Sequence, residues 1–420
     1  MLTELDQAID AHAEDAFEFL EALIAAQSVV GSEQRALEVF AARLEALDFA
    51  IDRLPFPEGQ LDDPRAGVSQ PHGRPEPRYQ VLGSTPGDGP LALLLNGHID
   101  VVPAETPERW ATPPFAPSRR DGRMYGRGAA DMKGGFAMGV LALTALRDVA
   151  PDLFARKRLG FIAVIEEECT GNGALHAAST GVLAPEVVLL EPTDLEIMTG
   201  GVGVLWVDVE VFGASAHAQT AHRSANAVEL GMRIVQAIRD WSAELTVLEP
   251  DPELGADDGP YNLNLGKVES GDWNSTVPTS ATFGLRVGFP RGWSPDRAET
   301  EVRAVIHAVA ANDPDFPREP RVRASGLRAE GHSIDSDHAL VEAISAAHED
   351  AHGSRPATFS LGSTTDARTY LNHFDVPAVC YGAVAHDMHG IDESVELQSI
   401  VDGARTLARF LITRFGEEAA

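Results

Sequence analysis

The sequence predicts an α/β fold in which a smaller α+β domain interrupts the chain of a larger one. In the first half, short apolar segments alternate with helical ones, as in layered α/β proteins. A β-α-β-β-α-β order follows, and residues 338–415 return to helix, strand and helix. The 420 residues suffice for two domains of ordinary size. We therefore expect a discontinuous catalytic domain of residues 1–202 and 329–420, with a lid domain of residues 203–328 inserted in it.

Two amphipathic helices are expected at the start of the chain. The first covers about residues 4–26, and the second follows an N-cap at Gly31-Ser32 and continues to about residue 47. Residues 53–78 are rich in Pro, Gly, Asp and Arg, so they are predicted to form a long surface loop.

Four short apolar segments predict the buried strands of the larger domain. They are residues 91–95, 159–165, 187–190 and 377–382. A helical stretch at about residues 133–149 lies between the first two, which gives the strand and helix alternation of an α/β layer.

The inserted domain begins with a different pattern. Residues 204–213 alternate apolar and polar side chains, which is typical of a strand with one exposed face. The elements after it follow the ferredoxin-like order of helix, strand, strand, helix and strand, at about residues 225–245, 262–269, 281–289, 295–311 and 321–327.

Charge and composition narrow the classes of function. Lys and Arg total 33 against 64 Asp and Glu, a net charge of −31, and such a field repels nucleic acids and anionic membranes. Cys169 and Cys380 are too few for a disulfide framework. The acidic N-terminus lacks a signal-peptide pattern, and apolar runs such as residues 91–95 are too short to span a bilayer. We expect a soluble, cytoplasmic protein without a nucleic-acid or membrane partner.

Histidines and carboxylates follow each of the four apolar segments, where α/β proteins place their sites. The residues at the strand ends are His98, Asp100, Glu166, Glu167, Glu168, Glu191 and His389. A glycine-rich loop adds Asp131 to this set. Each has a structural alternative when taken alone: a turn histidine, an N-cap aspartate for the helix at Lys133, or a solvated acidic turn. Their coincidence at four strand ends favours a ligand set of two histidines and three carboxylates, which is typical of a dinuclear hydrolytic zinc site.

Seven motifs, in order, resemble those of the M20 metallopeptidase family: GHIDVV, GRGAADMKGG, EEECTGNGA, EPT, ASAHA, TTDAR and HGIDE. That family includes acetylornithine deacetylase, succinyl-diaminopimelate desuccinylase, aminoacylase and glutamate carboxypeptidase. The resemblance implies a zinc-peptidase-like α/β/α catalytic domain with a lid or dimerisation domain. It also implies two Zn²⁺ ions per chain, which Co²⁺ can replace. The implied ligands are His98 and Glu191 for one ion, Glu168 and His389 for the other, and Asp131 as the bridge.

The same resemblance assigns the catalytic roles. Glu167 is the general base, Asp100 orients His98, and His217 polarises the scissile carbonyl, often from the other subunit. A cis peptide is expected after the bridging aspartate, at Asp131–Met132.

Three positions carry alternatives. Three glutamates stand where the family has Asp-Glu-Glu, so Glu166 takes the place of the aspartate and a register slip by one is the alternative. His386 competes with His389, whose spacing to the acidic residue matches the family better. Without the family, His217 reads equally well as a histidine in a turn.

The resemblance also implies the substrate class and the assembly. Asn274, Arg286, Thr364 and Arg368 match positions that contact substrate, although Arg286 could equally be structural. The expected reaction is hydrolysis of an N-acyl amino acid by a homodimer. A metallo-dipeptidase or carboxypeptidase acting on short peptides is one alternative, and a catalytically silent binding protein is the other.

Overall fold

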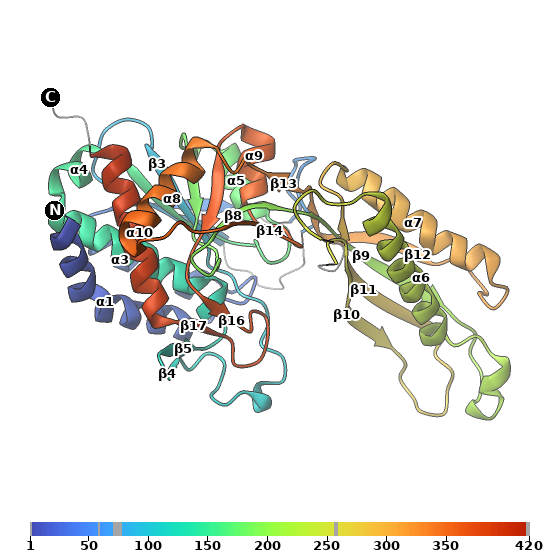
Figure 1. Cartoon of the computed structure of the whole chain (residues 1–420). Helices are drawn as coiled ribbons and strands as arrows, with labels where there is room; N and C mark the ends of the chain where they lie inside the picture. The colour runs from blue at the N-terminus through green and yellow to red at the C-terminus, as the bar shows by residue number, and fades with distance from the viewer. Residues whose placement is uncertain (1, 58, 70–77, 256–258, 417–420) are drawn as a thin grey trace.

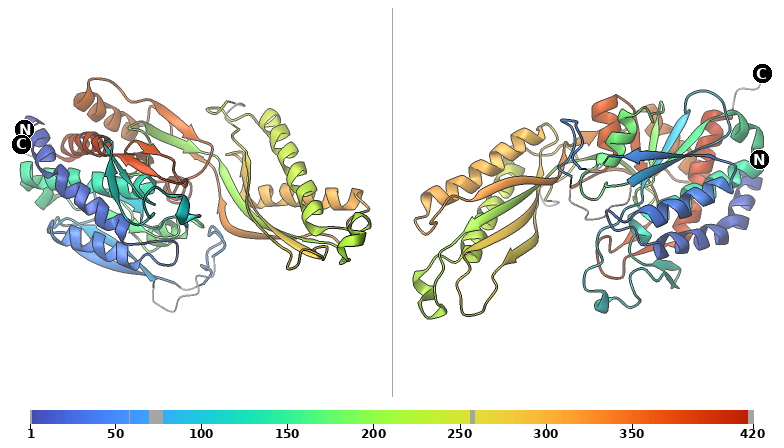
Figure 2. Two further views of the ribbon diagram at one scale, coloured as in Figure 1. Left: turned by 90° about the horizontal axis from the view of Figure 1, so that it is seen from below. Right: turned by 180° about the vertical axis from the view of Figure 1, so that it is seen from behind.

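The computed structural model describes residues 2–57, 59–69, 78–255 and 259–416. Two bodies of structure are visible in Figure 1, a larger one that contains both ends of the described chain and a narrower one beside it. Two further views separate the same bodies (Figure 2). The predicted α/β fold with an inserted α+β part is confirmed.

A mixed nine-stranded sheet forms the centre of the larger body. Its order is β1 (Ala50–Phe56), β2 (Arg78–Ser84), β6 (Leu159–Val164), β3 (Leu93–His98), β7 (Val187–Leu189), β15 (Ala378–Tyr381), β8 (Ile197–Gly201) and β13 (His332–Ser333), with β14 (Thr358–Leu361) also paired to β8. The four predicted apolar segments are β6, β3, β7 and β15, which are adjacent and parallel. Parallel neighbours end at the same edge of the sheet, so the residues after them converge.

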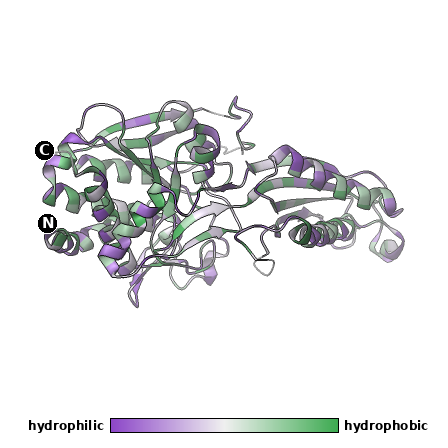
Figure 3. Cartoon of the chain, turned by 45° about the horizontal axis from the view of Figure 1, so that its top comes forward, coloured by the Kyte–Doolittle hydropathy of each residue, from purple (hydrophilic) through white to green (hydrophobic). Residues whose placement is uncertain are grey.

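Helices cover both faces of this sheet, so its central strands are buried on both sides. Leu93 and Leu95 belong to one apolar core while Leu94, one residue away, belongs to another. The first core includes side chains of α1 (Leu2–Ala25), α2 (Gln34–Glu45), α3 (Gly134–Val149), α8 (Ala339–His352) and α10 (Leu397–Phe415). The second includes α5 (Asn172–Ser179) and α9 (Ala367–Phe374). Figure 3 shows the central strands largely green, with purple residues mostly on the elements around them.

Helix α3 is the most apolar helix of the larger body. Together with the preceding turn η2 (Ala129–Lys133) it forms a stretch, Ala129–Val149, that is long and apolar enough to cross a membrane. Yet 94% of its most apolar window is buried inside the structure. The stretch therefore packs as a core helix between the sheet and helices α1 and α10.

The smaller body is a four-stranded antiparallel sheet with two helices. The strand order is β10 (Leu263–Ser270), β11 (Ser280–Phe289), β9 (Gly203–Phe212) and β12 (Arg321–Ala329). Helices α6 (Ala227–Leu248) and α7 (Pro295–Asn312) pack on the face that carries Val207 and Val209. The predicted β-α-β-β-α-β order is thus observed, and the domain boundaries at residues 203 and 328 stay a prediction.

The predicted loop at residues 53–78 is wrong at both ends. Strand β1 reaches Phe56 and β2 begins at Arg78, while residues 58 and 70–77 lie outside the described part of the chain. Strand β1 carries only one buried side chain, Phe56, so it has no apolar run to reveal it. The sequence analysis also missed the short strands of a second sheet, β16 (Ala385–His386), β17 (Ser394–Glu396), β5 (Arg123–Tyr125) and β4 (Ser118–Arg120).

Candidate metal centre and active site

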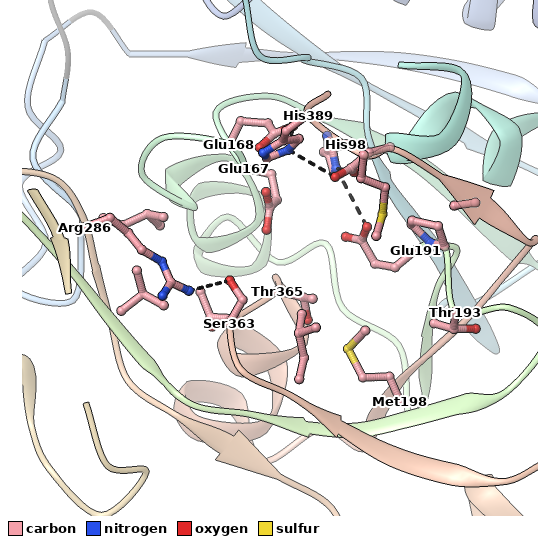
Figure 4. Close-up of a pocket in the computed structure, with 18 of the residues that line it drawn as sticks. His98, Glu167, Glu168, Glu191, Thr193, Met198, Arg286, Ser363, Thr365 and His389 are labelled. Carbon is pink, nitrogen blue, oxygen red and sulfur yellow. Dashed lines mark hydrogen bonds and ion pairs between the residues drawn. The ribbon is translucent and has the colours of Figure 1, made fainter. Parts of the chain in front are cut away.

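Side chains from five separate segments converge beside the edge where the central strands end (Figure 4). Two follow directly from parallel strands, since His98 is the last residue of β3 and Glu191 follows β7. The other three stand on turns or loops: Asp131 on η2, Glu168 after β6, and His389 between β16 and β17. All five residues line one cavity of about 590 Å³. The structure thus brings together the residues that the motifs predicted as ligands.

Asp131 lies at the centre of this cluster. Its Oδ1 is 2.9 Å from Nε2 of His98, and its Oδ2 is 3.2 Å from Nε2 of His389. Glu191 approaches His98 at 3.8 Å, whereas Glu168 is 3.1 Å from His389. Each oxygen of Asp131 therefore faces one histidine and carboxylate pair. The peptide bond from Asp131 to Met132 is cis, as expected.

The donor set fits a metal centre. Burial raises the pKa of Glu191 to about 8, against the opposing effect of His98. Burial disfavours protonated His389, but hydrogen bonds with Asp131 and Glu168 outweigh this effect and raise its pKa to about 11. Ligand atoms of His98, Asp131 and Glu168 all lie within 4.8 Å of one another. Imidazole and carboxylate ligands suit zinc and similar divalent cations, whose charge would offset that of the carboxylates.

The three adjacent glutamates point in different directions. Glu167 and Glu168 line the cavity, whereas Glu166 does not. Glu166 is buried and bonded to the Arg78 guanidinium, and it accepts a hydrogen bond of 2.8 Å from the Thr170 hydroxyl. Burial raises the pKa of Glu167 well above its usual range; His98 opposes this effect, and the neighbouring carboxylates add to it. The arrangement agrees with the chosen register of the glutamates.

Asp100 contacts His98 in an unexpected way. Nδ1 of His98 is 2.9 Å from the backbone oxygen of Asp100 and 3.9 Å from its carboxylate. The buried carboxylate instead accepts hydrogen bonds from the backbone N–H groups of Glu167 and Glu168, at 3.3 and 3.2 Å. Asp100 therefore supports both the histidine and the glutamate segment, and burial raises its pKa to about 8.

His386 is the last residue of β16, and His389 lies on the loop between β16 and β17. His386 lies 2.9 Å from the carboxylate of Glu396 and does not line the cavity. His389, with φ of 61°, turns its ring toward Asp131 and Glu168. The structure therefore brings the preferred histidine of the two to the cluster.

Glu393 holds the loop that carries Asp131, a role that the sequence analysis missed. Its fully buried carboxylate accepts hydrogen bonds from the backbone N–H groups of Gly128, Ala130 and Asp131, at 3.0, 3.0 and 2.9 Å. It also accepts one of 2.6 Å from Arg127, which donates a second bond to the His389 backbone oxygen. The acidic residue of HGIDE was the only signal, and it was read as a spacing marker.

We expect Glu393→Gln to weaken metal binding by about 10–100-fold, the usual cost of losing a group that orients metal ligands. The amide removes the negative charge and can no longer accept the full set of bonds, so the Asp131 loop loses its fixed position. Competition of the protein with a chelator for zinc measures the affinity. Glu396→Gln is the matched control, because Glu396 lies near the same loop but pairs with His386. Equal zinc affinity in both variants would contradict the assignment.

Arg286 projects from β11 into the same cavity (Figure 4). It donates hydrogen bonds to Asn262, to the Gly362 backbone oxygen and to the Ser363 hydroxyl, at 2.6, 3.1 and 3.0 Å. Within the described part of the chain no carboxylate pairs with this guanidinium. Thr364 also lines the cavity, and its buried hydroxyl has no hydrogen-bond partner among the described residues. Both predicted substrate residues are thus available to a ligand.

Arg368 is a different case, and its predicted contact with substrate is not supported. Its side chain is 4% exposed and does not line the cavity. It donates to the Thr170 backbone oxygen at 3.3 Å, because the turn before α9 directs it beneath the glutamate segment. Arg368 therefore contributes to the support of that segment.

His217 and Asn274 lie together, away from the five predicted metal ligands. Residues His217 and Thr276 form a β-bridge, and Nδ1 of His217 accepts a hydrogen bond of 3.1 Å from the Gln219 backbone. Both follow the end of the inserted sheet that is distant from the cavity (Figure 1). Ten-residue strand β9 spans about 30 Å at the usual rise per residue. Neither predicted residue lines the cavity of its own chain.

Comparison with protein families gives one match over most of the chain. The model of peptidase family M20/M25/M40 matches residues 94–413. A curated relative, the succinyl-diaminopimelate desuccinylase of Methylobacterium sp. (strain 4-46), is 30% identical over 405 residues, which cover 94% of each chain.

Solved structures with the same fold include two dipeptidases. Human carnosine dipeptidase 1 has a TM-score of 0.79 and 18% identity, covering 99% of both chains. The dipeptidase Dug1p of Saccharomyces cerevisiae has a TM-score of 0.79 and 17% identity, covering 100% of this chain and 99% of its own. At these identities the likeness establishes the fold.

Proposed function

Because this chain belongs to peptidase family M20/M25/M40 and is therefore a hydrolase of amide bonds, we propose that it is a dinuclear zinc enzyme that removes the acyl group from an N-acyl amino acid. One observation carries the proposal. Asp131 lies between two histidine and carboxylate pairs, in the same cavity as Glu167 and Arg286. The metal cluster, the base and the anion-binding group of such an enzyme are thus close together.

The proposed ligands are His98 and Glu191 for one zinc ion, Glu168 and His389 for the other, and Asp131 for both. Bound zinc would lower the pKa of water from 15.7 to about 7 and stabilise negative charge on the substrate oxygen. Glu167 takes the proton of the attacking water on its carboxylate and returns it to the leaving nitrogen.

Arg286 is proposed to bind the carboxylate of the amino acid. A guanidinium without a carboxylate partner presents a charged fork that suits such a group. Its bonds to Asn262, Gly362 and Ser363 hold it in place. Arg286 fixes one end of the substrate, so the amide next to that carboxylate is directed toward the metal cluster and Glu167.

A hydrolysis assay with and without zinc tests the proposed function. We expect the zinc-loaded protein to hydrolyse N-acetyl amino acids, with release of the free amine followed directly. A sample verified as metal-free should be inactive. Absence of hydrolysis of any N-acyl amino acid or dipeptide by the zinc-loaded protein would support the alternative of a silent binding protein.

Dipeptide hydrolysis is the second candidate. Asp194 and Glu196 line the cavity in addition to the cluster, and they would attract the ammonium group of a dipeptide. The carboxylate of a dipeptide could occupy the same position at Arg286. Parallel rates for an N-acetyl amino acid and the corresponding alanyl dipeptide distinguish the two activities.

We also propose that the active enzyme is a homodimer, in which His217 and Asn274 reach the cavity of the partner subunit. The support is their position at the distant end of the inserted sheet, together with the family resemblance. Inactive His217→Ala and Glu167→Ala chains, mixed under conditions that exchange subunits, should regain part of the activity. A lack of recovery in demonstrated heterodimers would indicate that each chain completes its own site.

A further inference from the structure

The cavity beside the metal cluster has two apolar surfaces. Met198, Phe359 and Leu361 form one of them, which we call the apolar floor. Met198 on β8 pairs with Phe359 on β14, and Leu361 follows two residues later, so all three project from one face of the sheet. Figure 4 shows Met198 on the side of Thr193, away from Arg286.

The second surface comes from the inserted sheet. Val204, Trp206 and Leu327 form it, and we call it the lid wall. Trp206 lies directly opposite Arg286 in the pairing of β9 with β11, and Val204 is two residues before it. Arg286 therefore projects from the same face as an apolar wall, so a carboxylate bound there places the rest of the ligand in apolar surroundings.

The charged side chains of the cavity wall are mostly acidic. Among the described residues that line it, Arg286 is the sole arginine or lysine. Asp194 and Glu196 add negative charge beyond the metal cluster and Glu167. The described lining offers neutral polar groups, such as the Thr364 hydroxyl, but no second arginine or lysine to pair with another carboxylate of a ligand. Moving an unpaired charge out of water into such a site is costly.

We propose that this site selects substrates with a single carboxylate, bound by Arg286, whose acyl group and side chain are uncharged and apolar and contact the apolar floor and the lid wall. The inference rests on the proposed function and concerns N-acyl amino acids, since the acyl group of a dipeptide carries an ammonium. It names the substrate class that this cavity accepts, and it excludes dicarboxylates such as N-succinyl amino acids.

Matched substrates test this selection directly. N-succinyl-leucine and N-(4-methylpentanoyl)-leucine have acyl groups with equal numbers of non-hydrogen atoms and differ in one carboxylate. N-(4-methylpentanoyl)-glutamate places the extra carboxylate on the amino-acid side. We expect kcat/KM for the monocarboxylate N-(4-methylpentanoyl)-leucine to exceed that of each dicarboxylate at least about tenfold, since the added charge has no partner. Equal or faster hydrolysis of either dicarboxylate would overturn the proposal.

A charge added to the apolar floor should reverse the preference. In Leu361→Lys, we expect the ratio of kcat/KM for N-succinyl-leucine to that for N-(4-methylpentanoyl)-leucine to rise at least about tenfold, because the ammonium supplies the missing partner. Val268→Lys is the matched control, since Val268 is 47% exposed on β10 and does not line the cavity. An unchanged ratio in folded Leu361→Lys, or an equal rise in the control, would contradict the assignment.

Binding separates failure of this inference from failure of the proposed function. If none of these substrates, nor any N-acetyl amino acid or dipeptide, is hydrolysed, the proposed function is wrong. Calorimetry with zinc-loaded Glu167→Gln then decides whether the cavity still prefers N-(4-methylpentanoyl)-leucine over N-succinyl-leucine. Tighter binding of N-(4-methylpentanoyl)-leucine supports the selection, and equal or weaker binding overturns it.

Discussion

Glu167→Gln should keep its metal and lose at least about a hundredfold in kcat, as general-base loss typically does. Glutamine has the same shape but accepts no proton at neutral pH. Glu167 lines the cavity next to Glu168, yet the histidines of the cluster pair with Asp131, Glu168 and Glu191 instead. Removing its charge should therefore leave the ligand set intact. Elemental analysis and kcat, measured on the same sample, test both halves of this statement.

The neighbouring glutamates provide the controls. Glu168→Gln should lose metal as well as activity, because its carboxylate lies 3.1 Å from His389 within the ligand set. Glu166→Gln should change kcat little, since Glu166 is buried away from the cavity against Arg78. It should instead lower the free energy of unfolding by about 1–3 kcal/mol, the cost of a disrupted buried polar pair. Urea unfolding measures that loss.

A slip of register by one residue would give a different pattern. Glu166→Gln would then yield the inactive enzyme with normal metal content, and Glu167→Gln would lose metal. The Asp100 carboxylate, which accepts hydrogen bonds from the backbone of Glu167 and Glu168, fixes how these residues enter the cavity. Glu166 lies outside the cavity and is bonded to Arg78, so the observed arrangement favours Glu167 as the base and Glu168 as the ligand.

The sequence predicted which side chains the structure brings together, because the residues that follow adjacent parallel strands lie at the same edge of the sheet. Buried on both faces, β6, β3, β7 and β15 read as continuous apolar segments, and they are neighbours in the sheet. Polar residues directly after them had to converge. Strands at or near the sheet edges, such as β1 and β14, have mixed burial patterns, so no run of apolar residues revealed them.

Supporting contacts were harder to predict than ligands. The Glu393 carboxylate binds backbone N–H groups of Gly128, Ala130 and Asp131, and backbone groups leave no mark on a sequence. Asp100 was expected to face His98 with its carboxylate, but the turn after β3 presents its backbone oxygen instead. The chain has 64 acidic residues, so a carboxylate near a motif does not by itself indicate a supporting role.

The two ends of the inserted domain show another limit of local patterns. Motif resemblance predicted both Arg286 and His217 as site residues. Arg286, on β11, lines the cavity, whereas His217, which follows the far end of β9, does not. Only the pairing of the strands distinguishes these outcomes. Position along a sheet depends on register, which the residues around each motif do not specify.

Zinc content per chain should fall stepwise as ligands are removed. We expect about two ions in the wild type, about one in His389→Ala, and less than one in Asp131→Asn, because each histidine and carboxylate pair holds one ion and Asp131 contributes to both. Treatment with a chelator should abolish activity, and added zinc should restore it. Full activity in a sample verified as metal-free would contradict the mechanism.

His386→Ala is the strictest control for that series. The two histidines are three positions apart, one at the end of β16 and one on the loop after it. The His386 side chain is 30% exposed and that of His389 is 51% exposed, so either substitution leaves the core untouched. His386 contacts Glu396 rather than Asp131 or Glu168. Its removal should therefore leave about two ions bound, since His386 neither belongs to the ligand set nor contacts a member of it. If His386→Ala lost an ion and His389→Ala kept both, the loop would have to invert its two histidines on binding metal, and the observed positions of Arg127 and Glu393 around His389 would then describe a different state.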